Sequence, residues 1–583
     1  MGVPQLTVTE GGNPIPWRGC RRVGSESNDT VSTSAAEGDH VITVDQTESK
    51  AGLSWLSTTT MASASSKVLD IDGGAPRPLS LYTWMCVLLS TVSAMLMGYD
   101  IGIMSGALLF VRQSLQLTEL QVEVIVGSLN LVAALGSLAS GHVAGWLGRR
   151  RALLMSSLLF LLGNVVLAVS PNFLCLLAGR VVTGLGVGFA MMIAPLYSAE
   201  ISPARVRGFL VSWTEVFVNL GILLGYLFGF AFEFASPRYN WRLMLGAGAL
   251  PAAFLGAAVL LRVLPESPRW LVLQGREDEA REVLRRVVCN GDEEEAHLRL
   301  DEILAANKEE LRQEIAAKEY VKSTGAAATS DSLFRRGLQF VTSPLARMYI
   351  IAIAINFFQQ ASGIDALVYY SPVVFGQAGI ESKAGKLGAT VGMGVTKLTF
   401  VLVATSLLDR VGRKKLLYLS AGGVATCLTS VAVTFMLMGL NSAKGDSMLS
   451  VSMKASAHAV SPAAVAITIL ALFAYVAFFS IGLGPISYVL TSEVFPLRHR
   501  STAVGVSIFV NRAVSGCVAL LFLTIAKAIT PAGTFLLFAG VTVLGMLFVR
   551  LVVPETKGKT LEEIGQDLSK VANASMEMQP TRV

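Results

Sequence analysis

Charged side chains stand inside apolar stretches of this 583-residue sequence, and these are the first places to look for chemistry. An ionised side chain at the centre of a bilayer costs about 2.5–3.5 kcal/mol on insertion scales, so each one needs a partner or a function. Three acids and three bases occupy such stretches: Asp100, Arg180, Glu215, Asp365, Lys397 and Arg512. Their balance predicts mutual pairing in a polar interior rather than six separate exposures to lipid.

Asp100 is the carboxylate best placed to carry a proton. It is the only charged residue between Leu81 and Val111, and it lies about one helical turn from the middle of that run. An unpaired carboxylate there could bind a proton near neutral pH, and Arg180 supplies a counter-charge that would make the titration switchable. Two interpretations stay open, namely proton coupling and a permanent ion pair that only fixes helix packing.

A second group of polar residues suits a ligand rich in hydroxyl groups. Gln359 and Gln360 are adjacent amides inside a span, which is costly unless something hydrogen-bonds them. Gly363 and Pro372 permit the helix to bend or break, the device by which transporters expose polar groups to a midplane cavity. Amides both donate and accept hydrogen bonds, as a polyhydroxylated ligand requires. Amide contacts between helices are the alternative.

Neighbouring spans are expected to contribute to the same cavity. Glu215 and Asn219 are four residues apart and share one face of the fifth span. Gly-Pro at 484–485 makes the tenth span breakable, and we predict that Lys397 pairs with Asp365 at the border of the cavity. The candidate substrate-binding residues are Glu215, Asn219, Gln359, Gln360, Asp365, Lys397, Tyr488 and Asn511.

Other reactive groups do not indicate catalysis. Gly184, Gly186 and Gly188 lack the spacing of a nucleotide-binding loop and lie inside an apolar span, so they indicate close helix packing. The histidines are scattered and the six cysteines lie far apart, which predicts neither a metal site nor a disulfide framework. A Walker motif is missing too, so ATP-driven transport is unsupported. We expect no enzyme activity, no metal and no cofactor.

The composition is that of a membrane protein. Hydrophobic residues make up 52% of the chain and charged residues only 15%, against roughly 25% charged in soluble domains. The mean hydropathy is +0.58. A net charge of +6 is explained by the Lys and Arg of short loops, which set membrane orientation. The expected partner is therefore the lipid bilayer, with no nucleic acid.

Twelve apolar stretches near the ~20 residues needed to cross a bilayer predict an all-α polytopic fold. We place them near 81–110, 122–145, 152–170, 173–199, 209–232, 243–264, 346–377, 387–409, 415–439, 462–491, 501–528 and 532–553. Residues 1–80 are expected to form a disordered cytoplasmic tail, 81–264 and 346–553 two six-helix halves, 265–345 a cytoplasmic helical linker, and 554–583 a cytoplasmic C-terminal tail. Within the linker, residues 276–288 and 293–322 are helix-like.

The two halves repeat each other in sequence. Three ordered pairs of segments match: GRR at 148–150 with GRK at 412–414, Glu200–Arg207 with Glu493–Arg500, and PES at 265–267 with PET at 554–556. The basic residues of these loops mark the cytoplasmic side. Such a duplication is typical of transporters whose substrate site lies between the halves near the bilayer midplane.

These motifs resemble the sugar porter family of the major facilitator superfamily over roughly residues 80–565. The likeness is carried by GRRR, DRVGRKK, PLYSAEISPARVRG, PESPRWL, QQASGID, GPISYVLTSEVFP and PETKGKTLEEI. Within the family the sequence is most similar to plant-type polyol/monosaccharide proton symporters, through FFQQASGIDALVYYSP, TVGMGVTKLTFVLVATSLLDRVGR and TEVFVNLGILLGY. The resemblance implies the major facilitator fold, with twelve transmembrane helices in two six-helix halves.

The resemblance also implies roles for residues. Asp100 would accept the proton with Arg180 as its partner. The positions that contact sugar hydroxyls in the family are Glu215, Gln359, Gln360, Asp365, Tyr488 and Asn511. Four residues depart from the glucose carriers and argue against an aldohexose preference: Glu215 replaces a glutamine, Asp365 and Lys397 replace asparagines, and Tyr488 replaces a tryptophan. The cytoplasmic gate would consist of Arg149, Glu200, Arg205, Arg207, Asp409, Arg410, Arg413, Glu493 and Arg500, with charge that only sets topology as the alternative.

The expected function is secondary active transport. Polyols or monosaccharides would be taken up together with protons by alternating access. The plasma membrane is the expected location and the vacuolar membrane the alternative. A facilitative sugar or inositol carrier and a non-transporting sugar receptor are the competing functions.

Overall fold

The computed structural model describes residues 80–203, 206–236, 238–288, 293–323, 344–438, 461–495 and 497–555. The secondary structure of these residues is helical, without β-strands. They contain twelve helices long and apolar enough to cross a membrane. The all-α polytopic prediction is thus confirmed, whereas the predicted tails up to residue 79 and from residue 556 lie outside the described residues.

The first half contains six membrane-spanning segments. They are α2 (Leu81–Leu115), α3 (Glu119–Leu147), α4 (Arg149–Val169), α5 (Phe173–Ile201), α6 (Arg207–Ala231) with the 3₁₀ turn η2 (Phe232–Phe234), and the pair α7 (Asn240–Gly246) and α8 (Ala249–Leu260). The predicted sixth span is therefore interrupted, and it begins three residues earlier than expected. Helix α2 is the most enclosed, and it approaches α6 so closely that a side chain at Gly98 or Gly221 would collide with backbone.

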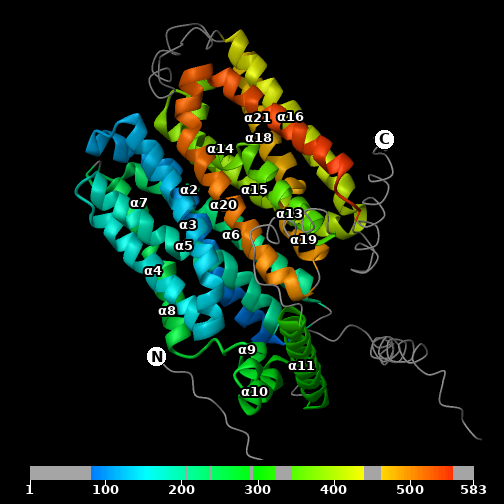
Figure 1. Ribbon diagram of the computed structural model, residues 1–583. Helices are drawn as coiled ribbons and strands as arrows, with labels where there is room; N and C mark the ends of the chain where they lie inside the picture. Colours follow the sequence, from blue (N-terminus) through cyan, green and yellow to red (C-terminus); the bar gives the residue numbers. More distant parts are fainter. Residues whose placement is uncertain are drawn as a thin grey trace, which may run out of the picture. The chain divides into compact units, whose positions relative to one another are not determined.

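The second half repeats this arrangement. Its helices are α13 (Pro344–Ala361), α14 (Ile364–Gln377), α15 (Lys383–Val411), α16 (Arg413–Leu437), α18 (Pro462–Ile481), α19 (Leu483–Val494), α20 (Leu497–Ile529) and α21 (Pro531–Leu551). The α13–α14 pair is one span that breaks at Gly363 and kinks again at Tyr370, close to the predicted Pro372. The α18–α19 pair is one span that breaks at Gly482. The halves meet where α20 packs against α3 and α15 packs against α6 (Figure 1).

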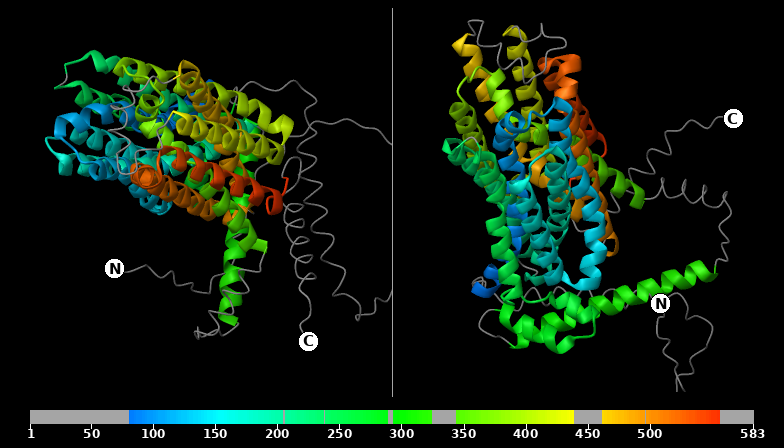
Figure 2. Two further views of the ribbon diagram at one scale, coloured as in Figure 1. Left: turned by 90° about the horizontal axis from the view of Figure 1, so that it is seen from above. Right: turned by 90° about the vertical axis from the view of Figure 1, so that its left-hand side faces the viewer.

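The segment between the halves forms three further helices at one end of the bundle, as Figure 2 shows. They are α9 (Pro268–Leu273), α10 (Glu277–Val287) and α11 (Glu293–Ser323), so the two helices predicted in the linker are confirmed within about a residue. Helix α10 contacts the start of α2, since the Thr83 hydroxyl donates to the carbonyl of Val287 at 2.8 Å. We call this end, which also carries the Arg-rich loops after α3 and α15, the inner end, and its opposite the outer end.

Candidate functional site

Asp100 and Arg180 form a fully buried ion pair in the first half. Arg180 Nη1 lies 2.7 Å from Asp100 Oδ2, and the two residues are 0% and 1% exposed. Arg180 Nε donates to the Ile125 carbonyl of α3 at 3.1 Å, so the guanidinium also bridges to a second helix. Within the described residues, Asp100 Oδ1 has no hydrogen-bond partner. Among the described residues, one oxygen of this carboxylate therefore contacts the guanidinium and the other is buried without a donor.

Tyr369 of α14 connects this pair to the second half. Its hydroxyl accepts a hydrogen bond from Asn130 Nδ2 of α3 at 3.2 Å, and Asn130 also donates to Ser515 Oγ of α20 at 2.9 Å. The charges of both the Asp100–Arg180 pair and the Asp365–Arg512 pair act on the Tyr369 hydroxyl. The two charged groups thus share one polar neighbour at the boundary between the halves.

The predicted amide cluster is present in the second half, and Asn511 of α20 is its centre. Asn511 Nδ2 donates to Gln359 Oε1 at 2.6 Å and to Asn356 Oδ1 at 3.1 Å. The Tyr488 hydroxyl lies 3.4 Å from Asn511 Oδ1. Gln359 Nε2 in turn donates to the Gly484 carbonyl at 3.0 Å. Residues from three spans therefore form one hydrogen-bonded cluster of buried amides and one half-buried phenol.

Asp365 forms its ion pair with Arg512, which corrects the predicted Asp365–Lys397 pair. Arg512 Nη1 lies 3.6 Å from Asp365 Oδ2, and Ser515 Oγ also donates to that oxygen. With its amide nitrogen turned toward Asp365 Oδ2 (3.1 Å), Gln360 accepts from Arg512 Nη2 at 2.8 Å. Among the described residues, no carboxylate lies within 4.0 Å of the Lys397 ammonium group. Arg512 and Ser515 are three residues apart on α20, so they share one face of that helix, and both contact the same Asp365 oxygen.

Lys397 and Glu215 border the same region from α15 and α6. Glu215 Oε1 accepts from Asn219 Nδ2 at 3.1 Å, as their spacing on one helix face predicted. Lys397 is 9% exposed, and the charges of Asp365 and Glu215 both act on its ammonium group. Its charge is therefore shared between two carboxylates at longer range instead of being paired with one.

Two broken helices position the amides. Gly363 has φ +87°, in the left-handed region that only glycine adopts readily, and it separates α13 from α14. The tenth span breaks at Gly482, two residues before the predicted Gly-Pro pair. The break places the Gly484 carbonyl in the first turn of α19, where Gln359 bonds to it. The predicted breaks are thus confirmed, with the second slightly displaced.

Three of the gate residues, Arg149, Glu200 and Arg413, make hydrogen bonds within their own half. Arg149 Nε and Nη2 each donate to the Glu200 carboxylate at 2.8 Å, a bidentate pair between α4 and α5. Arg413 Nη1 donates to the Leu408 carbonyl at 3.3 Å. Arg207 and Arg410 are described and have interaction partners. Arg205 lies outside the described residues, as do the side chains of Asp409, Glu493 and Arg500.

Glu266 and Glu555 cap equivalent helices, a role that the sequence repeat signalled but that was not predicted. Glu266 Oε1 accepts from the backbone N–H groups of Arg149 (2.8 Å) and Arg150 (3.0 Å) at the start of α4. Glu555 accepts from those of Arg413 and Lys414, both at 3.1 Å, at the start of α16. Burial raises the pKa of the Glu266 carboxyl, although the N–H donors oppose this shift.

The seam between the halves is closed at its outer end and loose at its inner end. A Cβ added to Gly127 of α3 would lie 2.6 Å from Leu520 Cβ of α20, and one added to Gly394 of α15 would lie 2.7 Å from the Tyr226 ring of α6. In contrast, a Cβ added to Gly141 or Gly505, on the inner parts of α3 and α20, would have no described neighbour within 4 Å. Among the described residues, these close contacts between the halves therefore belong to the outer part of the seam.

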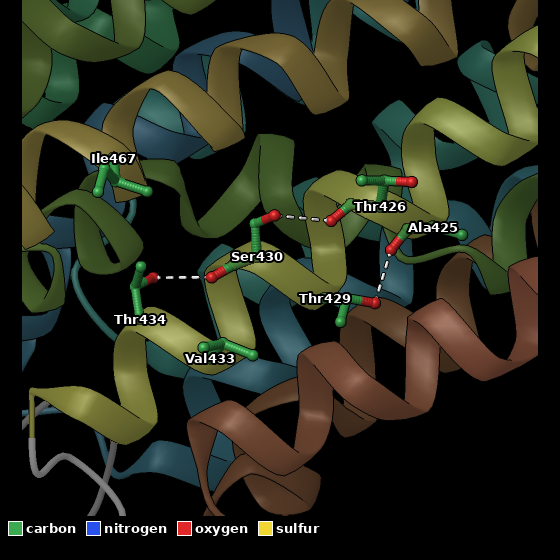
Figure 3. Close-up of a pocket in the computed structure, with 7 residues that line it drawn as sticks. All are labelled: Ala425, Thr426, Thr429, Ser430, Val433, Thr434 and Ile467. Atoms are coloured by element: carbon green, nitrogen blue, oxygen red, sulfur yellow. Dashed lines mark hydrogen bonds between the residues drawn. The ribbon is translucent and has the colours of Figure 1, made fainter.

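An open groove elsewhere on the second half is not the polar site. It has a volume of about 530 Å³ and lies between α16 and α18. The hydroxyls of Thr429, Ser430 and Thr434 donate to carbonyls of their own helix at 2.8, 2.9 and 3.0 Å, as Figure 3 shows. Because these hydroxyls are already satisfied, the groove offers a ligand little polar recognition.

Several residues of the central network were not predicted as site residues. They are Asn130, Asn356, Tyr369, Arg512 and Ser515. The sequence could have indicated three of them: Arg512 is a charged residue inside a span, and Asn130 and Asn356 are amides inside apolar stretches. Tyr369 and Ser515 are ordinary inside spans, so only their position in space identifies them.

Comparisons with known proteins agree with this architecture. The family model described as "Sugar (and other) transporter" matches residues 85–568. The chain is 42% identical over 485 residues to "Probable polyol transporter 4" of Arabidopsis thaliana, covering 83% of this chain and 84% of that protein. It is 40% identical over 487 residues to "Polyol transporter 5" of the same plant, covering 83% and 86%.

Among solved structures, the chain is similar to those of a bacterial sugar transporter. The partially occluded, inward-open conformation of the xylose transporter XylE from E. coli matches with a TM-score of 0.66 and 25% identity, over 83% of this chain and all of that chain. The proton:xylose symporter XylE bound to 6-bromo-6-deoxy-D-glucose matches with a TM-score of 0.65 and 26% identity, over 84% and 99%.

Proposed function

This chain belongs to the sugar transporter family of the major facilitator superfamily, and from that premise we propose that it is a proton-coupled symporter that takes up polyols or monosaccharides. As a member of that family it is a multi-pass membrane transporter and not an enzyme. The relatives named as polyol transporters and the proton:xylose symporter support the substrate class and the coupling. The plasma membrane is the proposed location.

The observation that carries the proposal is a fully buried Asp100–Arg180 ion pair in the first half. Asp100 takes up a proton when the cavity faces outward, which neutralises the carboxylate and weakens its hold on Arg180. Asn130 links this region to the second half, because it donates to the Tyr369 hydroxyl and to Ser515, which in turn donates to Asp365. Substrate binding and protonation then favour the same conformational change, which is the requirement for coupled transport.

The substrate binds at the amide cluster in this proposal. Each hydroxyl of a polyol both donates and accepts a hydrogen bond, and Gln359, Gln360 and Asn511 can do both in return. Glu215, Asn219, Asp365, Lys397 and Tyr488 are the remaining proposed contacts. The nine gate residues named above close the inner end when the halves rock to the outward-facing state.

The test is uphill uptake into proteoliposomes with an imposed proton gradient, with a linear polyol, inositol, a pentose and a hexose as substrates. Asp100→Asn is expected to lower the accumulation ratio to about one, because an amide cannot carry the proton, while substrate exchange continues. Glu279→Gln, an exposed change in α10, is the matched control and should accumulate normally. Wild-type accumulation by Asp100→Asn would contradict the coupling role. Wild-type uptake indifferent to a protonophore would instead favour facilitated transport.

A further inference from the structure

Glu123 is a buried carboxylate outside the proposed proton and substrate sites. It lies on α3, one turn from the outer start of that helix, and is 1% exposed. Its Oε1 accepts from the backbone N–H of Thr524 at 2.7 Å, and its Oε2 from the Thr524 hydroxyl at 2.6 Å. No Lys or Arg of the described residues lies within 4.0 Å of it. One residue of the opposite half therefore holds this carboxylate.

We infer that Glu123 and Thr524 form an outer gate contact that sets the balance between inward-facing and outward-facing states. The two residues are 401 positions apart, on helices of different halves. Because the halves of such transporters move largely as rigid bodies, this contact exists only while the outer ends are together. A hydrogen bond to an ionised group is roughly twice as strong as a neutral one. Losing it therefore favours the outward-facing state.

The surroundings of the contact support this role. One turn further along α3, Gly127 meets Leu520 and the Gly516 carbonyl of α20, and Asn130 then donates to Ser515. These contacts make a continuous closed seam that ends outward at Glu123. Thr524 itself is exposed, so the carboxylate lies at the edge of the seam, where the first separation of the halves releases it. Glu123 is thus a positioning residue for transport that touches no substrate.

The inference rests on the alternating access proposed above, and a distance measurement tests it independently of proton coupling. Spin labels are attached at Ser114 and Leu437, exposed positions at the outer ends of α2 and α16, neither of which carries the contact. The full chain, with its native cysteines replaced by serine and transport retained, is reconstituted in liposomes. The ratio of long to short label distances then reports outward-facing against inward-facing populations.

Glu123→Ala is expected to raise that ratio about tenfold, the factor that corresponds to about 1.4 kcal/mol. Thr524→Val should raise it less, because the backbone N–H stays, and the double variant should match Glu123→Ala alone. Glu119→Ala, a change of carboxylate in the first turn of the same helix, is the control and should not shift it. The apparent KM for external substrate should fall in Glu123→Ala, since the outward-facing state becomes more populated.

Unchanged distances in an inserted Glu123→Ala chain would overturn the inference, as would strictly additive effects of the two single variants. If Glu123→Ala fails to fold, Glu123→Gln is measured in its place. The glutamine amide can still make two hydrogen bonds to Thr524, but it lacks the negative charge. Glu123→Gln should raise the ratio of long to short label distances by less than tenfold. An unchanged ratio in this variant would also overturn the inference. If the distances shift while Asp100→Asn still concentrates substrate, the outer gate contact stands and only the proton role of Asp100 fails.

Discussion

At the scale of single residues, the proposed substrate site holds four charged side chains, although its expected ligand is neutral. Asp365 and Arg512 form a direct pair at 3.6 Å, whereas Lys397 lies under the influence of both Glu215 and Asp365. A carboxylate can accept from two hydroxyls at once, and a guanidinium can donate to two oxygens in a fixed geometry. Balanced charges can therefore bind polyol hydroxyls without giving the empty site a net charge.

The Asp365–Arg512 pair is expected to behave as a unit. Asp365→Asn or Arg512→Gln alone should lower thermal stability strongly, since breaking a buried ion pair costs about 3–5 kcal/mol. The double variant should lose less than either single change because it strands no charge. A double-mutant cycle on the melting temperature and uptake of the purified chain measures this coupling.

A second cycle on Asp365 and Lys397 supplies the comparison for that prediction. Its coupling should be smaller, since no direct contact joins the two groups. Additive losses in the Asp365–Arg512 cycle would contradict the pairing.

From the sequence, charge balance predicted that these residues meet inside the protein. It could not identify the partner of Asp365, because both α15 and α20 pack against α14, and only the positions of Lys397 and Arg512 in space decide between them.

At the scale of elements, the interruptions in the spans are as informative as the spans. Apolar length alone located all twelve spanning segments, because each must satisfy its own backbone hydrogen bonds in lipid. Gly363 and Pro372 predicted the break in the seventh span. The sixth-span interruption between α7 and α8 was missed, because its glycines lie among alanines and leucines that also suit a continuous helix.

The break at Gly363 is expected to be essential for positioning the site. Gly363→Ala requires an L side chain at φ +87°, and its Cβ would lie 2.5 Å from the Phe538 ring. The strain should cost about 1–3 kcal/mol and displace Gln359 and Asp365 relative to each other. Thermal unfolding and substrate binding measured on the purified chain should both weaken.

Gly422→Ala is the matched control for that change. Gly422 lies inside α16, and an added Cβ there would have no neighbour within 4 Å. Since alanine stabilises a helix by about 1 kcal/mol relative to glycine, this variant should be at least as stable as wild type. Equal behaviour of the two variants would mean that the break is not needed.

At the scale of the whole molecule, one seam serves two conformations in the proposed alternating-access mechanism. Gly141 and Gly505 continue the same faces of α3 and α20 on which Gly127 and Gly516 pack closely. The outer pair is closed and the inner pair open, so rocking the halves exchanges which pair is packed. The sequence repeat predicted two halves with a site between them. It could not predict which end is closed, because the same residues serve both states.

Bulk added at the inner part of the seam should therefore shift the protein in the direction opposite to loss of the outer gate contact. A Cβ added at Gly141 meets no described neighbour within 4 Å in the present conformation, but the side chain of Gly141→Leu should crowd α20 when the inner ends come together. Overpacking costs about 1–3 kcal/mol, which corresponds to roughly a 5- to 150-fold shift toward the inward-facing state. Labels at Ser114 and Leu437 should then report fewer long distances, and the apparent KM for external substrate should rise. Gly540→Leu, on an exposed face of α21, adds the same bulk away from the seam and should change neither quantity. A Gly141→Leu chain that opens outward as readily as wild type would mean that α3 and α20 do not close the inner end.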